Sequence, residues 1–281
     1  MQNSSKIAQI VDIRDTLDRP DVAIYRTLRR PVDHLLQRIF VGEGWNVVSR
    51  LLKSSLRIRS LLVTPEWYER VKTAPRLQDE SVMIYRAPLA LVEEIVGFNL
   101  HQGIMAVAEM PADPVLVDVL AAIGSTGLIV ALDGLVSAEN VGVVVRNCAG
   151  LGADLILAGE TAGSPYLRRA VRNSMGTVFS MPVIHLPSLA ACLTVLRNEH
   201  GYDILAADPL GSQTLYATDL TGKVCVVVGN EGKGLSPDVL PLCNLHVSIP
   251  MAKETDSLNV ANATAVILSE ALRQRKYNSK E

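Results

Sequence analysis

The sequence predicts a two-domain α/β protein whose second domain is a parallel sheet covered on both faces by helices. The chain has 281 residues, which exceeds the usual size of one domain. Its 48% hydrophobic and 20% charged residues supply a buried core and too little charge for disorder. Beyond residue 110, apolar runs such as 224–228 alternate with helical patterns, which is typical of central parallel strands.

The first domain is predicted over 25–110 as a small α/β layer. We expect helices at 31–39, 44–54, 65–72 and 88–95, and strands at 58–64, 82–85 and 104–108. Residues 1–24 are polar and weakly periodic, so they are expected to be an extension with little structure of its own. Pro111 and Pro114 interrupt both periodicities, and the boundary is therefore placed between 110 and 111.

The second domain is predicted over 111–281. Expected strands are 127–132, 153–158, 178–185, 203–207, 223–228 and 245–249, and expected helices are 140–151, 188–199 and 257–276. Ligands of such sheets bind beyond the carboxyl ends of strands, so the loops after Leu132, Val228 and Ile249 are predicted to form the site.

Composition argues against several classes of protein. No apolar run approaches the ~18 residues that span a bilayer, and charged residues occupy the first twenty positions where a signal peptide needs an apolar core. The four cysteines form no C-x-x-C pair and lie in apolar strings, which predicts reduced, buried thiols. The five histidines lack metal-ligand spacing. We therefore expect a cytoplasmic location, no membrane contact and no metal.

Positive charge is concentrated in one stretch although the net charge is −2. The segment between Tyr25 and Ser60 contains eight basic residues and only two acidic ones, Asp33 and Glu43. This excess favours contact with RNA phosphates, and solvated faces of amphipathic helices explain it equally well. The candidate RNA-binding residues are Arg26, Arg29, Arg30, Arg38, Arg50, Lys53, Arg57 and Arg59.

Three loops carry the candidate chemistry, and each has an ordinary structural explanation when taken alone. In 132–147, Asn140 near the helix start is also a plausible N-cap, and Arg146 a surface arginine. In 228–235, three glycines permit close approach of a ligand, but the loop matches neither a Walker A nor a dinucleotide motif, and an empty turn explains it too. In 249–262, Ser257 is also a plausible helix cap.

Taken together and in this order, the loops N-x-G-x-x-x-R, G-N-E-G-K-G-L-S and I-P-M…S-L-N-V closely resemble the signature motifs of SpoU-type (TrmH-like) RNA ribose 2′-O-methyltransferases of the SPOUT superfamily. Residues 172–176 resemble the family's serine-glycine segment. Residues 40–44 and 101–104 resemble the start and end of its ribosomal-protein-like RNA-binding module. The chain departs from the common pattern at 137–139, where many members have Asp-Pro, and at Asn262.

The resemblance implies a C-terminal trefoil-knotted parallel-sheet domain, a smaller N-terminal RNA-binding domain and a homodimer. It implies S-adenosylmethionine as cofactor and methyl transfer to a ribose 2′-hydroxyl of ribosomal or transfer RNA, with ribosomal RNA favoured by the separate N-terminal module. The implied cofactor residues are Gly229, Asn230, Gly232, Gly234, Ile249, Met251, Ser257 and Leu258, the last against the adenine. The implied catalytic residues are Asn140, Arg146, Glu231, Ser257 and Asn259.

Within that scheme, a guanidinium is a poor base, so we expect Arg146 to grip a phosphate and stabilise alkoxide charge, with Asn140 orienting it. Glu231 either anchors Arg146 or accepts the proton. The final helix is expected at the dimer interface through an apolar face made of Val260, Ala263, Ile267, Leu268, Ala271 and Leu272, for which burial within one subunit is the alternative.

Two other functions remain open from the residues. One is a non-catalytic RNA-binding or ribosome-assembly protein on the same fold. The other is a dinucleotide-dependent oxidoreductase, which the missing fingerprint in the first strand-to-helix turn disfavours.

Overall fold

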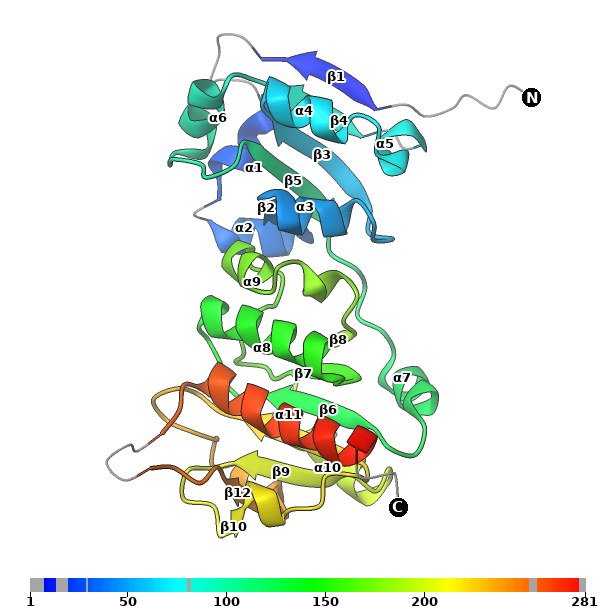
Figure 1. Ribbon diagram of the computed structural model, residues 1–281, viewed down its shortest axis with the longest axis vertical. Helices are drawn as coiled ribbons and strands as arrows, with labels where there is room; N and C mark the ends of the chain where they lie inside the picture. Colours follow the sequence, from blue (N-terminus) through cyan, green and yellow to red (C-terminus); the bar gives the residue numbers. More distant parts are fainter. Residues whose placement is uncertain (1–7, 14–19, 29, 80–81, 253–256, 278–281) are drawn as a thin grey trace, which may run out of the picture. The chain divides into compact units, whose positions relative to one another are not determined.

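The computed structural model describes residues 8–13, 20–28, 30–79, 82–252 and 257–277 (Figure 1). The chain forms two compact units. Unit 1 contains residues 1–111 together with 166–179, and unit 2 contains 112–165 and 180–281. The chain therefore enters unit 2, returns to unit 1 for fourteen residues and then completes unit 2.

Unit 1 is built on a five-stranded mixed sheet with the order β1-β4-β3-β5-β2. β1, β4 and β3 are mutually parallel, whereas β5 is antiparallel to both β3 and β2. The strands are β1 (Gln9–Asp12), β2 (Ile39–Glu43), β3 (Ile58–Val63), β4 (Met83–Arg86) and β5 (Ile104–Glu109). The helices are η1 (Pro20–Val22), α1 (Ala23–Arg26), α2 (Pro31–Leu36), α3 (Trp45–Leu51), α4 (Pro65–Val71), α5 (Pro75–Asp79) and α6 (Leu89–Val96).

Two strands of unit 1 differ from the sequence prediction. β1 lies within the residues expected to be an unstructured extension, and Asp12 holds it by accepting two hydrogen bonds from Arg86 of β4, at 2.6 and 2.9 Å. β2 begins at Ile39, where a helix was predicted to end. Arg38 takes a left-handed φ of 49°, which ends the helical path, and all five residues of β2 are buried.

Residues 166–179 complete the core of unit 1. They contain α9 (Arg168–Asn173) and η2 (Thr177–Phe179), neither of which was predicted. The ring of Phe40 on β2 lies 5.5 Å from that of Tyr166 and 5.3 Å from that of Phe179, so both ends of the segment pack on one buried side chain.

An ion-paired cluster holds the middle of the same segment. The carboxylate of Glu43, which is 9% exposed, accepts hydrogen bonds from Arg168 and, at 3.3 Å, from Arg172. Arg50 of α3 donates to the carbonyl oxygen of Met175. Most of the serine-glycine segment identified in the sequence is thus fixed by side chains of unit 1.

Unit 2 contains a seven-stranded sheet with the order β10-β12-β9-β11-β6-β7-β8, and every recorded strand pair is parallel. This confirms the predicted parallel sheet. The strands are β6 (Leu128–Leu132), β7 (Leu155–Ala158), β8 (Val183–His185), β9 (Asp203–Ala207), β10 (Gln213–Thr214), β11 (Val224–Val228) and β12 (Leu245–Ser248). β8 is shorter than the predicted 178–185, because residues 177–179 form the 3-10 turn η2.

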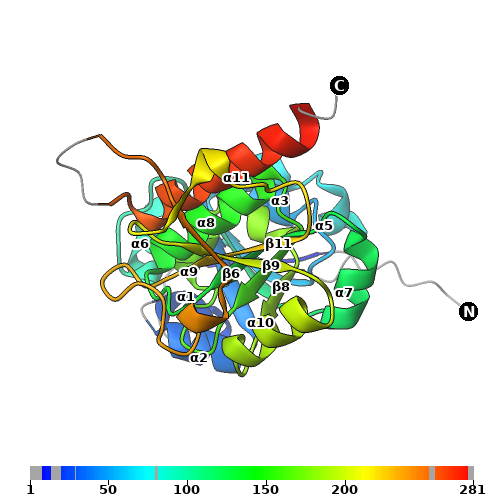
Figure 2. The ribbon, with the colours of Figure 1, turned by 90° about the horizontal axis from the view of Figure 1, so that it is seen from below.

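Helices cover both faces of this sheet, as Figure 2 shows. α7 (Leu116–Ile123), which the sequence did not predict, and α10 (Leu189–Asn198) pack with the sheet residues of one face. α8 (Ala138–Leu151) and α11 (Val260–Tyr277) pack against each other on the other face. Two short turns, η3 (Leu215–Ala217) and η4 (Leu240–Leu242), complete the unit.

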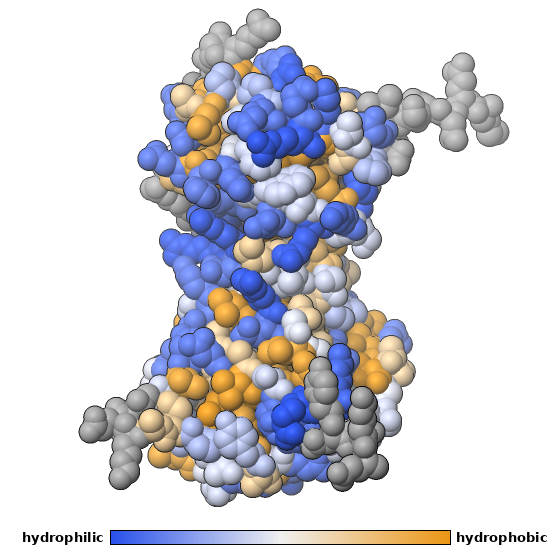
Figure 3. Space-filling model, in the orientation of Figure 1, coloured by the Kyte–Doolittle hydropathy of each residue, from blue (hydrophilic) through white to orange (hydrophobic). Residues whose placement is uncertain are grey.

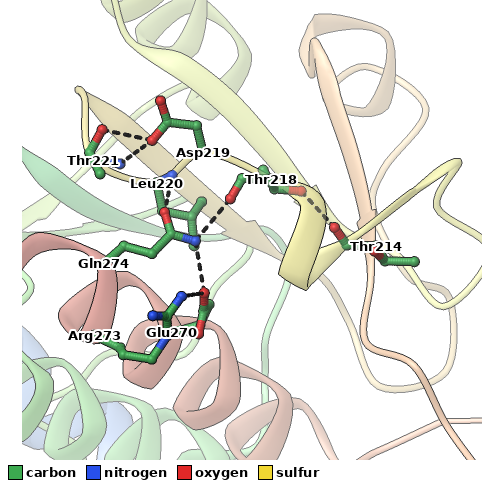
Figure 4. Close-up of polar contacts among 8 residues, drawn as sticks. All are labelled: Thr214, Thr218, Asp219, Leu220, Thr221, Glu270, Arg273 and Gln274. Carbon is green, nitrogen blue, oxygen red and sulfur yellow. Dashed lines mark hydrogen bonds and ion pairs between the residues drawn. The ribbon is translucent and has the colours of Figure 1, made fainter. Parts of the chain in front are cut away.

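A buried polar cluster anchors the last turns of α11 to the chain before β11 (Figure 4). The side-chain amide of Gln274 accepts from the Leu220 amide at 2.8 Å and donates to the Thr218 carbonyl at 2.9 Å. It also donates to Glu270, whose carboxylate accepts from Arg273 at 2.7 and 2.8 Å. These bonds fix the axis of α11, and the residues that precede α11 belong to the candidate site.

Candidate active site

A cavity of about 390 Å³ opens in unit 2 at the carboxyl ends of β9, β11 and β12. These strands are neighbours in the sheet, so the loops that follow them converge there. The lining combines apolar side chains with backbone and a few polar groups. It consists of Ala207, Asp208, Pro209, Val228, Gly229, Asn230, Glu231, Gly234, Val247, Ile249, Met251, Ser257, Leu258, Asn259, Val260, Ala263 and Ile267.

The glycine-rich loop after β11 folds back on itself. The backbones of Asn230 and Gly234 exchange two hydrogen bonds of 2.9 Å. The side-chain oxygen of Asn230 accepts from the amides of Gly232 and Lys233, and its nitrogen donates to the Gly134 carbonyl at 2.9 Å. Asn230 therefore sets the shape of this loop and ties it to the loop after β6.

Gly229 is a glycine because the loop closes directly over it. A Cβ on Gly229 would lie 2.4 Å from the carbonyl carbon of Gly234 and 2.6 Å from the Leu235 nitrogen. Both atoms belong to the backbone, so neither is able to move without opening the loop. The wall of the cavity at this point is main chain, which brings its amides and carbonyls within reach of a ligand.

Three polar side chains from segments far apart in the sequence meet beside the cavity. Asn140 donates to the Glu231 carboxylate at 2.7 Å and accepts from the Asn259 side chain at 3.1 Å. Glu231 and Asn259 line the cavity, whereas Asn140 joins them from α8 without lining it. We call Asn140, Glu231 and Asn259 the polar trio. All three were candidates from the sequence.

The helix caps answer two questions that the sequence left open. The N-cap of α8 is Ser137, whose hydroxyl accepts from the Asn140 amide at 3.3 Å, so the Asn140 side chain is available to the trio. At the start of α11, the Asn259 side-chain oxygen accepts from the Ala261 amide at 2.9 Å, and its carbonyl accepts from Ala263. Asn259, rather than Ser257, is the residue that caps α11.

Arg146 does not join the trio. It follows Asn140 by six residues on α8, about 9 Å along the axis and about 120° around it. It is exposed and does not line the cavity, and within the described ranges its guanidinium has no hydrogen-bond or ion-pair partner. The geometry of one subunit thus leaves Arg146 outside the site it was assigned to.

The cavity gathers most of the predicted cofactor residues. Gly232 does not line it, whereas the other seven do: Gly229, Asn230, Gly234, Ile249, Met251, Ser257 and Leu258. Met251 and Leu258 are each 37% exposed, so they form part of the rim. Residues 253–256 of the third loop lie outside the described residues.

One lining segment was missed by the sequence prediction. Ala207, Asp208 and Pro209 follow β9, which lies between β11 and β12 in the sheet. Asp208 belongs to the lining, and its carboxylate lies 3.9 Å from Nδ1 of His246. The rule that ligands bind at strand ends would have selected this loop had the strand order been known. The loop after Leu132, which was selected, does not line the cavity but is bonded to the glycine-rich loop. The Gly134 carbonyl accepts from Asn230, and the Asp133 carboxylate accepts from the Ser236 amide at 2.5 Å.

The candidate RNA-binding residues belong to unit 1, and several already have protein partners. Arg57 and Arg59 both approach the Glu109 carboxylate, at 3.4 and 2.9 Å, and Arg38 donates to the Pro111 carbonyl at 2.7 Å. Arg50 donates to Met175, as described above. Arg30 and Lys53 are exposed, Arg26 is half-buried, and Arg29 lies outside the described residues.

The cysteines agree with the prediction of reduced, buried thiols. All four are free and buried, and burial raises the pKa of every thiol, to about 11 for Cys192 and Cys243. Among the described residues, no group of three or more His, Cys, Asp or Glu side chains is placed to hold a metal ion. No helix in the described part combines the length and apolar character needed to cross a membrane.

The fold and the cavity define an α/β protein with a small-molecule site at the carboxyl edge of a parallel sheet. The family model of the SpoU rRNA Methylase family matches residues 127–269. The chain belongs to this family and is an RNA methyltransferase by that membership.

Relatives and solved structures agree with this assignment. An uncharacterized tRNA/rRNA methyltransferase of Mycobacterium tuberculosis (strain H37Rv) is 31% identical over 273 residues, covering 94% of this chain and 93% of the relative. The SpoU methyltransferase AviRb from Streptomyces viridochromogenes, in complex with AdoMet, is 28% identical with a TM-score of 0.78, covering 92% of this chain and 99% of AviRb. A protein described as an RNA 2′-O ribose methyltransferase is 27% identical with a TM-score of 0.75, covering 94% and 99% of the two chains.

Proposed function

We propose that this protein transfers a methyl group from S-adenosylmethionine to a ribose 2′-hydroxyl, with ribosomal RNA as the substrate class. The observation that carries the proposal is the polar trio at the rim of a cavity whose walls are backbone and apolar side chains. Likeness to an RNA 2′-O ribose methyltransferase and to an AdoMet-bound relative supports it.

The residues of the cavity fit the cofactor. About 390 Å³ lies within the range of small-molecule sites, about 300–1,000 Å³. Val228, Val247 and Ile267 are buried apolar walls suited to an adenine ring, and Leu258 stands at the rim. The closed backbone at Gly229 presents main-chain groups to the polar edge of a nucleoside. Asp208 supplies a carboxylate that suits the ammonium group of the cofactor's methionine moiety.

When bound, S-adenosylmethionine supplies a methyl group activated by a positively charged sulfur. This chain must then place the ribose hydroxyl in line with that group and remove its proton. Glu231 is the carboxylate of the polar trio. Asn140 donates to its Oε1, and among the described residues its Oε2 has no hydrogen-bond partner. We assign Glu231 as the group that would accept the proton of the 2′-hydroxyl. The 2′-oxygen would take the methyl group from the cofactor's sulfur, which would keep the electron pair of the broken carbon–sulfur bond. Asn140 and Asn259 orient the Glu231 carboxylate.

Arg146 is assigned to the phosphate beside the target ribose and to the developing alkoxide charge, as its chemistry indicates. Because one subunit leaves Arg146 outside its own cavity, we propose that it acts across a homodimer interface, at the cavity of the second copy. A mixture of two inactive variants, Arg146→Ala and Glu231→Gln, should then regain activity, since one mixed site retains both groups.

The proposed interface lies on the face that carries α8 and α11. The predicted apolar stripe on α11 had two explanations, a dimer interface and burial within one subunit. Burial within one subunit is confirmed for Ile267, Leu268 and Ala271, which are fully buried. Val260, Ala263 and Leu272 remain half-buried. Figure 3 shows hydrophobic side chains gathered over these helices. The dimer therefore rests on a narrower apolar surface than the sequence predicted.

The same proposal includes a trefoil knot in unit 2, RNA binding by unit 1 and action in the cytoplasm. It is tested by incubating the purified protein with ribosomal RNA and S-adenosylmethionine, and mapping 2′-O-methylated nucleotides by mass spectrometry. A single new 2′-O-methyl site that Glu231→Gln abolishes is the expected result. Methylation on a base, or cofactor binding with no transfer to any RNA, would refute the proposed reaction.

A further inference from the structure

The only two tryptophans of the chain, Trp45 and Trp67, meet at the surface of unit 1. Their ring centroids are 5.7 Å apart with an interplanar angle of 34°. The guanidinium of Arg70 lies 4.6 Å from the centroid of the Trp67 ring. Trp45 is 37% exposed, whereas tryptophan side chains are usually well buried. The three side chains form a partly open stack, which we call the tryptophan stack.

One short segment holds both tryptophans in place. The amide of Trp45, the first residue of α3, donates to the Gln102 side chain at 2.6 Å. The Trp67 amide donates to Thr64, the N-cap of α4, at 3.4 Å, and the Thr64 amide donates to the Gly103 carbonyl at 2.9 Å. Both helix starts are thus tied to residues 102–103, so the ring geometry is preorganised before any ligand arrives.

Local charge does not explain the stack. Arg70 is paired with Glu66 at 2.6 Å, and Lys72, the residue that follows α4, is paired with Glu69 at 2.5 Å. The two basic side chains are therefore neutralised by the two acidic side chains of α4, and the site offers little net attraction for phosphate. What it offers is the face of an indole ring whose orientation is fixed.

We infer that the tryptophan stack binds an unpaired base of the RNA substrate. A base is a flat, partly apolar π-system, and proteins hold unpaired bases against aromatic rings and arginine planes. A base laid against the exposed part of Trp45 would add a fourth flat group to Arg70, Trp67 and Trp45. The inference rests on the proposed function, because it adds to it a contact that selects single-stranded RNA.

The stack also supplies its own reporter. Since both tryptophans lie in it, tryptophan emission of the intact protein comes from this site alone. The probes are a single-stranded oligoribonucleotide, the same strand with abasic positions, and its fully paired duplex. We expect the unpaired strand to quench the emission, and the abasic strand and the duplex to quench it far less.

Variants separate stacking from charge. Trp45→Ala should weaken binding of the unpaired strand about 5- to 150-fold, the equivalent of about 1–3 kcal/mol per stacked base, while Trp45→Phe retains most of the affinity. The salt dependence of binding should keep its slope, because no phosphate contact is lost. Tyr216→Ala is the matched control, since Tyr216 is an exposed aromatic residue of unit 2 at 66% exposure.

Two outcomes would overturn the inference. One is an unchanged affinity of folded Trp45→Ala for the unpaired strand. The other is equal quenching by the strand and its abasic form, which would leave the stack to a protein partner or to no ligand. If Trp45→Ala fails to fold, Trp45→Leu replaces it, since leucine keeps apolar bulk without an aromatic face. A folded Trp45→Leu protein that binds the unpaired strand as tightly as Trp45→Phe would overturn the inference. Binding is read without methyl transfer, so failure of the proposed reaction would leave these results intact.

Discussion

The glycine-rich loop allows a graded test of the cofactor site, because its three glycines differ in what a methyl group would meet. A Cβ on Gly229 would lie 2.4 Å from a backbone carbon, well below the ~3.5 Å of an ordinary carbon contact. Forcing such an overlap costs about 1–3 kcal/mol, and the loop opens to relieve it. Gly229→Ala should therefore weaken S-adenosylmethionine binding about 5- to 150-fold.

The two other glycines provide matched controls. Gly234 has a φ of 69° and free space around it, so Gly234→Ala carries only a backbone cost of about 1–2 kcal/mol, or about 5- to 30-fold in affinity. Gly232 has a single neighbour at 3.7 Å and no left-handed φ, so Gly232→Ala should stay within about twofold of wild type. Isothermal titration calorimetry gives the three affinities, and thermal unfolding shows that each variant is folded.

The order of the three affinities tests whether the glycine-rich loop forms the wall of the cofactor site. A Gly229→Ala protein that binds S-adenosylmethionine as well as wild type would show that the loop does not form the cofactor wall. Equal losses for Gly229→Ala and Gly232→Ala would show that any added methyl group disturbs the loop, and the argument from close backbone approach would be refuted.

Three further predictions concern the reaction and the stability of each unit. Arg146→Ala should abolish methyl transfer while the affinity for S-adenosylmethionine, measured by calorimetry, stays near wild type. Arg146→Lys should restore little activity, since lysine lacks the planar guanidinium that donates two parallel hydrogen bonds. Wild-type turnover in the alanine variant would contradict the assignment. Gln274→Ala leaves the buried Leu220 amide unpaired, so urea denaturation should show a loss of about 1–3 kcal/mol, and the same change at half-buried Gln213 should cost less. Burial lowers the pKa of His34, so the unfolded chain binds more protons than the folded one. Stability should therefore fall as the pH drops below about 6.5, and a flat urea midpoint between about pH 7.5 and 5.5 would contradict this.

The sequence predicted the elements that have strong periodic signals. Runs such as 224–228 have no polar face, so they indicated central parallel strands correctly, and the helices α8, α10 and α11 were found within three residues of their ends. β1 has only four residues, mostly exposed, and is held by pairing with β4 and by Arg86, neither of which leaves a local signal. β2 was missed because only the left-handed φ of Arg38 separates it from α2, and an arginine gives no sequence signal for such a turn.

The sequence likewise predicted some features of the candidate site and missed others. Asn140, Glu231 and Asn259 were chosen by resemblance to family motifs, and the structure brings them together over separations of 91 and 119 residues. No spacing rule predicts those contacts, because they depend on the strand order of the sheet. That order also explains why the loop after β9 was missed. For Arg146, the motif predicted the chemistry of the side chain but not its position, which is outside the cavity of its own subunit.

The return of residues 166–179 to unit 1 affects how the chain folds as it is synthesised. Glu43 and its partner Arg168 are 125 residues apart, and at about 5–20 residues per second the ribosome needs about 6–25 s to supply the second after the first. During that interval Phe40 has neither of its aromatic partners, and Glu43 has no arginine to neutralise it. The amino-terminal sheet must therefore wait, with an apolar edge open to solvent, until about a third of unit 2, residues 112–165, has been synthesised.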